Sequence, residues 1–258
     1  SINPIFLLPS AVETRVDEIA EGLCGSLNLG VGQFCTCPGL VILEKGEAAE
    51  QFMTALVDRV ARTEPGTMLH HGIFRAYAEA IHLRDETFGV EHLVYPETLE
   101  PNQARPALFR TTARNYLDRP ELMQEIFGPS ALLVEVENRE EMLMVAESLE
   151  GELTSGVFGN EEEFQSMAYL MQILERKAGR LIFNQYPTGV EVCPSMVHGG
   201  PFPATSDGRK TSVGTAAVFR FTRRIAYQNW PQSMLPEMLR DGNPLHISRM
   251  TNGGWSRK

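Results

Sequence analysis

Two cysteines, Cys35 and Cys37, lie two residues apart in the segment GQFCTCPG, which glycine and proline residues bound. Thiols in such a loop can bind a metal ion, form a redox pair, or supply one nucleophile beside a second thiol without a chemical role. A further interpretation gives neither cysteine a chemical role. The residues that surround the pair are needed to distinguish between these alternatives.

A metal site would combine Cys35 and Cys37 with the adjacent histidines His70 and His71. The CxC spacing lacks the paired CxxC arrangement that is typical of zinc sites. Cysteines two residues apart are also poorly placed for a relaxed disulfide. We therefore expect no metal site, and we expect free thiols.

A cysteine nucleophile reacts as its thiolate, which the N–H dipoles of a backbone-rich, partly open loop can stabilise. The N–H group of the same residue can also stabilise an oxyanion. This argument applies equally to Cys35 and Cys37, so physical chemistry alone leaves the choice open.

The elements around this loop indicate an α/β domain. A strand in the opening segment SINPIFLLPSA precedes a helix, which Ser10 and Glu13 would begin as a capping box. Gly179 has the position of a helix C-cap. Such alternation predicts a largely parallel sheet flanked by helices, with ligands at the carboxyl ends of its strands. The pattern predicts strands at 40–43, 107–111, 131–137, 153–158, 181–184 and 219–228, helices at 47–63, 119–126, 139–149 and 161–177, a polar stretch over 84–103, and an irregular loop over 186–215.

Composition restricts the class of partner. The chain has 258 residues, 43% of them hydrophobic, and a net charge of −10. A negative chain is a poor partner for nucleic acid or for an anionic membrane surface. Four scattered cysteines and the lack of an apolar run of about 20 residues favour a soluble, cytoplasmic protein. The start has neither an initiator Met nor a secretory pattern, which indicates a segment of a longer protein.

Two motifs in order resemble those of one family. GQFCTCPG resembles the active-site cysteine motif of aldehyde dehydrogenases, and EIFGP, from Glu125 to Pro129, matches the second signature of that family. The segments SINPIFLLPSA, FNQYPTGVEV, MVHGGPFPATSD and TSVGTAA are similar to the branch that contains α-ketoglutaric semialdehyde (2,5-dioxovalerate) dehydrogenases and a bacterial fatty aldehyde dehydrogenase. The resemblance extends over nearly the whole chain.

The resemblance implies an aldehyde dehydrogenase catalytic domain over 1–215, then an oligomerisation strand and tail over 216–258. It implies oxidation of an aldehyde by NAD or NADP, through a thiohemiacetal and a thioester on cysteine, in a homo-oligomer. The branch implies α-ketoglutaric semialdehyde as the substrate, with a fatty aldehyde as the alternative.

The same resemblance assigns site residues. Cys35 takes the place of the nucleophile, Glu125 that of the carboxylate that holds the nicotinamide ribose, and Phe127 that of the aromatic beside the nicotinamide. Without the motif, Glu125 would be a solvated helix-end carboxylate and Phe127 a core residue. Cys37, Cys24 and Cys193 are expected to have no catalytic role. The substrate pocket would include Phe34, Thr36, Thr188, Gly189 and His198.

The family's general-base glutamate, its oxyanion asparagine and its cofactor domain have no counterpart in this chain. The resemblance therefore implies the C-terminal catalytic portion of such an enzyme. The competing hypothesis is a non-enzymatic acidic module that assembles through the 219–228 segment.

Overall fold

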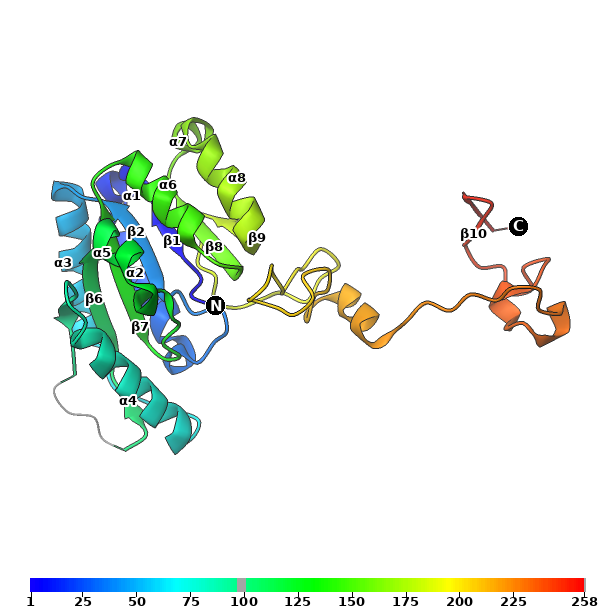
Figure 1. Ribbon diagram of the computed structural model, residues 1–258, viewed down its shortest axis with the longest axis horizontal. Helices are drawn as coiled ribbons and strands as arrows, with labels where there is room; N and C mark the ends of the chain where they lie inside the picture. Colours follow the sequence, from blue (N-terminus) through cyan, green and yellow to red (C-terminus); the bar gives the residue numbers. More distant parts are fainter. Residues whose placement is uncertain (97–100, 258) are drawn as a thin grey trace. The chain divides into compact units, whose positions relative to one another are not determined.

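The computed structural model describes residues 1–96 and 101–257, which form two compact units. The first unit, Ser1–Arg220, contains a seven-stranded sheet in the order β4-β6-β7-β2-β1-β8-β9 (Figure 1). Every pairing in it is parallel except that of β4 with β6. This confirms the predicted α/β class with a largely parallel sheet. The strands are β1 (Ile5–Leu7), β2 (Leu40–Glu44), β4 (Glu91–Val94), β6 (Ala107–Thr112), β7 (Ser130–Val136), β8 (Glu152–Phe158) and β9 (Ala178–Phe183).

Helices cover both faces of this sheet because its central strands are apolar on both sides (Figure 1). In β1, Ile5 and Leu7 face one layer of helices, whereas Phe6 faces the other. The first layer contains α1 (Pro9–Thr14), α2 (Val16–Asn28) and α3 (Glu47–Ala61). The second contains α4 (His71–Asp85), α5 (Ala113–Asp118), α6 (Arg139–Ser148), α7 (Glu161–Ser166) and α8 (Ala168–Lys177). A short pair, β3 (Gly66–Thr67) with β5 (Gln103–Ala104), is antiparallel.

The segments that carry the cysteine and EIFGP motifs enter strands rather than leave them. GQFCTCPG directly precedes β2, EIFGP directly precedes β7, and Ser1 to Pro4 precede β1. These segments therefore meet at the amino ends of the parallel strands. The expectation of a site at the carboxyl ends was wrong, because the motif-bearing loops lead into the strands.

Several local predictions were also wrong. Helix α1 begins after Leu8 with Pro9 in its first turn, and Ser10 contacts Glu163 of α7 instead of forming a capping box. The predicted helix at 119–126 is α5 followed by a 3-10 turn, η2 (Pro120–Met123). Gly179 lies inside β9, and helix α4 was missed. The helix predicted over 161–177 is divided at Met167 into α7 and α8.

The segment 219–228 is not a strand in this chain. Its first residues end a 3-10 helix, η3 (Thr215–Phe221), and residues 222–228 have no regular structure. A strand needs a hydrogen-bonded neighbour, and none of the chain's described strands pairs with this segment. The alternating pattern alone was therefore insufficient.

The second unit begins at Phe221. It contains two 3-10 turns, η4 (Gln232–Met234) and η5 (Glu237–Leu239), and a hairpin of β10 (Arg249–Thr251) and β11 (Gly254–Ser256). Within residues 1–96 and 101–257, no helix combines the length and the apolar character needed to cross a bilayer.

Candidate active site

Cys35, Glu125 and Phe127 line one cleft of about 510 Å³ at the amino ends of the strands. The cysteine motif and EIFGP, about 90 residues apart in sequence, thus contribute to the same cavity. The remaining lining residues are Ser1, Ile2, Tyr116, Met123, Gln124, residues 148–153, Pro203 and Ala204.

The glycines before the cysteines bring the two motifs together. After α2 the chain turns through η1 (Leu29–Gly32), where Gly30, Val31 and Gly32 all have positive φ angles of 57°, 60° and 64°. A Cβ atom on Gly32 would lie 2.3 Å from the backbone of Gly128 in EIFGP. Glycine is therefore needed at position 32 both for the turn and for the close approach of the two loops.

Cys35 and Cys37 point into different surroundings. Cys35 is exposed, and its Sγ lies 3.1 Å from Nε2 of His198. The Sγ of Cys37 lies 3.7 Å from the Leu27 carbonyl and 3.9 Å from that of Gly128. Burial, aided by the negative charge of Glu125, raises the pKa of the Cys37 thiol to about 12. Cys37 thus remains protonated at neutral pH and is a poor nucleophile.

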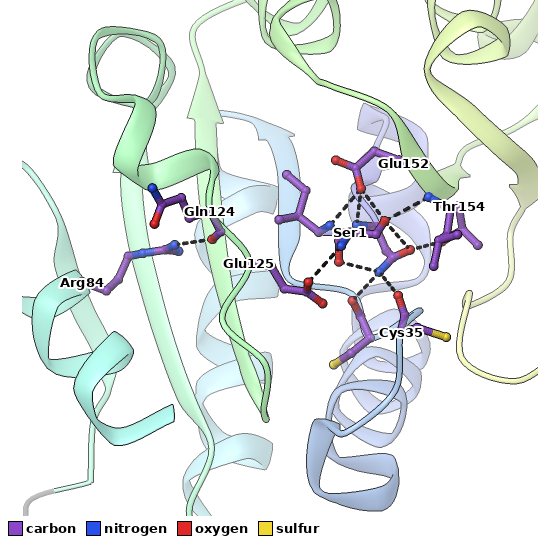
Figure 2. A network of polar contacts seen from close by, with 11 residues as sticks. Ser1, Cys35, Arg84, Gln124, Glu125, Glu152 and Thr154 are labelled. Carbon is purple, nitrogen blue, oxygen red and sulfur yellow. Dashed lines mark hydrogen bonds and ion pairs between the residues drawn. The ribbon is translucent and has the colours of Figure 1, made fainter. Parts of the chain in front are cut away.

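Asn3 fixes the backbone of the cysteine loop (Figure 2). Its Nδ2 donates hydrogen bonds to the carbonyls of Cys35 and Cys37, at 2.9 and 3.1 Å. Its Oδ1 accepts a hydrogen bond of 2.8 Å from Thr154 of β8. Asn3 is fully buried and has a φ angle of 49°, a backbone region that asparagine tolerates better than most residues.

Glu152, the first residue of β8, holds the segment that contains Asn3 (Figure 2). Its Oε2 accepts hydrogen bonds from the backbone N–H groups of Ile2 and Asn3, at 2.8 and 3.2 Å, and from the Ser1 hydroxyl at 2.5 Å. Burial raises the pKa of Glu152, while these hydrogen bonds act in the opposite direction. Glu152 and Asn3 were missed in the sequence, although an acidic residue that opens a buried strand is a recognisable signal.

Glu125 and Phe127 fit a nicotinamide cofactor. The Glu125 side chain is 36% exposed, and its Oε2 lies 2.9 Å from the Ser1 amino nitrogen (Figure 2). The Phe127 residue is 39% exposed and lines the same cleft. An accessible carboxylate can accept hydrogen bonds from ribose hydroxyls, and an exposed ring can lie against a flat heterocycle.

Arg84 of α4 anchors the backbone just before Glu125. The Arg84 side chain is buried, and its Nη2 donates a 3.0 Å hydrogen bond to the Gln124 carbonyl (Figure 2). Burial lowers the pKa of Arg84 to about 10, so it remains a cation at neutral pH. The position of Glu125 thus depends on a buried charge that the sequence analysis did not identify.

None of the five residues predicted for the substrate pocket is among the described residues that line this cleft. His198 contacts Cys35, whereas the Phe34 ring lies over Gly30 and Thr36 is buried. The hydroxyl of Thr188 donates to the Ser26 carbonyl at 3.3 Å. Among the described residues that line the cleft, none is Phe34, Thr36, Thr188 or Gly189.

Arg180 of β9 interacts electrostatically with His198 and was also missed. Its Nη2 donates to the Pro187 carbonyl at 2.7 Å, and its Nη1 to the Gly189 carbonyl at 3.2 Å. Burial, together with the positive charge of Arg180, lowers the pKa of His198. His198 is therefore a neutral imidazole at pH 7.

The metal alternative has no support in the arrangement of the histidines. The Nδ1 of His70 accepts hydrogen bonds from the backbone of Gly72 and Ile73, so His70 caps helix α4. Within the part of the chain that the structure describes, no three His, Cys, Asp or Glu side chains are grouped to hold a metal ion.

The chain is similar to known proteins of one family. Residues 2–214 match the aldehyde dehydrogenase family. Two curated relatives, alpha-ketoglutaric semialdehyde dehydrogenase of Acinetobacter baylyi and alpha-ketoglutaric semialdehyde dehydrogenase 2 of Azospirillum brasilense, are 43% and 44% identical over 98% of this chain. The chain spans 48% of the length of each.

The fold is also found in a solved structure. The crystal structure of 1-pyrroline-5-carboxylate dehydrogenase from Thermus with bound NAD superposes with a TM-score of 0.65 at 22% identity. That match covers 83% of this chain and 40% of the Thermus chain. The family match over most of the chain and the two relatives above 40% identity lead to one conclusion: the chain belongs to the aldehyde dehydrogenase family.

Proposed function

We propose that the protein carrying this chain oxidises an aldehyde to a carboxylate with NAD or NADP, with Cys35 as its nucleophile. The observation that carries the proposal is the single cleft in which Cys35 faces the same space as Glu125 and Phe127. The three residues come from the two motifs that the family resemblance assigns to the nucleophile and to the cofactor. Their convergence gives the chemistry a common location.

Cys35 supplies the covalent step. Its thiolate attacks the aldehyde carbon and forms a thiohemiacetal, and loss of a hydride from that carbon gives a thioester that water hydrolyses. A bound nicotinamide cofactor supplies the hydride acceptor. Glu125 would bind the hydroxyls of the nicotinamide ribose, and Phe127 would pack beside the nicotinamide ring. Cys37, which stays protonated, takes no part.

The proposed substrate is α-ketoglutaric semialdehyde, and the product is 2-oxoglutarate. The names of the two relatives support this choice, whereas the alternative is a fatty aldehyde. The test is to compare kcat/KM for 2,5-dioxopentanoate with kcat/KM for a long-chain aldehyde. Both rates are measured as the formation of reduced cofactor. A tenfold preference for the long-chain aldehyde, about 1.4 kcal/mol, would contradict the assignment.

A Cys35→Ala variant in the same assay separates an enzyme from an assembly module. Loss of turnover in Cys35→Ala and its retention in Cys37→Ser support the enzyme. Equal rates in both variants and the parent protein would reject Cys35 as the nucleophile.

We further propose that the protein is a cytoplasmic homo-oligomer, with a catalytic domain over 1–215 and an assembly segment over 216–258. The exposed apolar residues Phe219, Phe221 and Ile225 support this role, because such side chains commonly mark interaction sites. In the assembly, residues 219–228 would pair with a sheet of another subunit. Light scattering tests this proposal: a larger mass is expected, and a monodisperse monomer would contradict it.

A further inference from the structure

His198 touches the sulfur of the proposed nucleophile, a contact that the oxidation chemistry above does not use. The distance from Cys35 Sγ to His198 Nε2 is 3.1 Å, which is within hydrogen-bonding reach of a thiol. We propose that His198 is a catalytic residue that accepts the thiol proton of Cys35. We also propose that Arg180 is a positioning residue whose positive charge favours the neutral form of His198. This inference rests on the proposed role of Cys35 as the nucleophile.

Hydrogen bonds hold both the backbone N–H and the backbone carbonyl of His198. The His198 N–H donates to the Thr211 hydroxyl at 2.8 Å. The His198 carbonyl accepts from the Ser212 N–H at 2.9 Å and from the Ser212 hydroxyl at 3.0 Å. The backbone that carries the imidazole is therefore fixed independently of the contact with Cys35.

The charges around His198 favour the form that accepts a proton. Arg180 lies on β9, and Asp207, Lys210 and Arg220 line a second cleft of about 410 Å³ with His198. Burial and the positive charge of Arg180 are the causes that lower the pKa of His198. A neutral imidazole with its proton on Nδ1 leaves the Nε2 lone pair free for the thiol.

The proton transfer is balanced within the pair. The S–H bond of Cys35 breaks, an N–H bond forms at Nε2 of His198, and the electron pair stays on sulfur. Arg180 also interacts electrostatically with Cys35. Arg180 thus favours the neutral form of the acceptor before the transfer.

Alkylation of Cys35 isolates this step from the oxidation. Iodoacetamide forms an S–C bond as iodide leaves, and the reaction requires neither aldehyde nor cofactor. The rate is measured on the complete protein from pH 5 to 9, and peptide mapping confirms the labelled residue. Because only neutral His198 accepts the proton, the rate should rise through an inflection below the ordinary histidine pKa of about 6.5. A profile without this inflection would overturn the proposal, and this measurement needs no variant.

Substitution of His198 gives the second readout. His198→Gln should lower the alkylation rate at pH 7 by at least tenfold and abolish the inflection, since general bases typically contribute about 10²-fold or more. The matched control is His82→Gln, which makes the same change on the exposed surface of α4. An unchanged rate and profile in His198→Gln would overturn the proposal.

The role of Arg180 is tested by the direction in which the inflection of the pH profile moves. Arg180→Gln removes the cation, so the pKa of His198 and the inflection should move to higher pH. Arg180→Lys keeps the charge and should leave the inflection in place. An inflection that stays fixed in Arg180→Gln would overturn the role of Arg180. The alkylation assay involves no aldehyde or cofactor, so it is independent of the proposed function. A protein that shows these pH profiles but does not oxidise aldehydes would refute the proposed function and leave the role of His198 intact.

Discussion

The side-chain amide of Asn3 donates a 2.9 Å hydrogen bond to the backbone carbonyl of Cys35. The same amide nitrogen reaches the carbonyl of Cys37, so one buried side chain fixes the loop at two points. The segment before β1 and the loop before β2 are therefore joined directly beneath the reactive thiol. This link makes the position of Cys35 sensitive to residues that never touch the substrate.

Removal of the Asn3 side chain should loosen the cysteine loop. Asn3→Gly deletes the hydrogen bonds but tolerates the positive φ angle, so the effect is not one of backbone strain. We expect a loss of about 1–3 kcal/mol in the free energy of unfolding, because buried carbonyls lose their donors. Urea denaturation measures this loss, and iodoacetamide labelling should show an altered rate at Cys35.

A control for Asn3→Gly is Asn160→Ala, at the N-cap of helix α7. This change should cost about 1 kcal/mol of stability. It should leave the reactivity of Cys35 unchanged because it lies outside the cleft. Equal labelling rates in Asn3→Gly and the parent protein would contradict the positioning role of Asn3.

Glu152 should make stability depend on pH. Because burial raises its pKa in the folded state, ionisation of Glu152 costs more in the folded protein than in the unfolded chain. The contribution of Glu152 to the free energy of unfolding is fully present below the pKa of glutamate in the unfolded chain, about 4.3. It is lost as pH rises through the pKa of Glu152 in the folded protein. Glu152→Gln keeps a hydrogen-bond acceptor without the charge. The stability of this variant relative to the parent protein should therefore increase as pH rises from 4 to 7.

Urea denaturation at several pH values measures this difference. Glu175→Gln removes one exposed carboxylate from α8 and controls for the change in net charge. If the parent protein gained stability over Glu152→Gln as pH rose, the hydrogen bonds to the carboxylate would outweigh its desolvation.

Cys35 should be labelled before Cys37. The Cys37 thiol has a pKa near 12 and stays protonated in mildly alkaline buffer, whereas the Cys35 thiol is exposed in the cleft. Limited treatment with iodoacetamide at pH 8, followed by peptide mapping, should find the label on Cys35 with Cys37 unmodified. Faster labelling of Cys37 would contradict the assignment.

Glu125→Gln should slow hydride transfer and leave thiol alkylation largely intact. The carboxylate would orient the nicotinamide ribose, and orientation contributes separately from activation of the nucleophile. Pre-steady-state formation of reduced cofactor should fall by tenfold or more, while the alkylation rate of Cys35 changes little. An unchanged hydride step would remove Glu125 from the cofactor site.

Much of the sheet could be predicted because its strands are short apolar runs between helical patterns. Strands β2, β6 and β7 lie within one residue of the predicted bounds. Helix α4 was missed although Phe74, Tyr77 and Ile81 follow helical spacing. The segment 219–228 shows the opposite failure, because alternation predicted a strand that has no partner in the described chain.

The candidate site could be predicted only where a motif marked it. Cys35, Glu125 and Phe127 line one cleft, as their motifs implied. Asn3, Glu152 and Arg180 escaped notice because their roles depend on contacts with residues far away in sequence. Spacing along the chain carries no information on such contacts.

The most direct test of the account is to trap the covalent intermediate. The complete protein is mixed with 2,5-dioxopentanoate and NAD or NADP, quenched in acid, digested and analysed by mass spectrometry. We predict a thioester adduct on Cys35 that disappears in Cys35→Ser and persists in Cys37→Ser. Turnover in Cys35→Ser at the parent rate, or an adduct on another residue, would contradict the central claim.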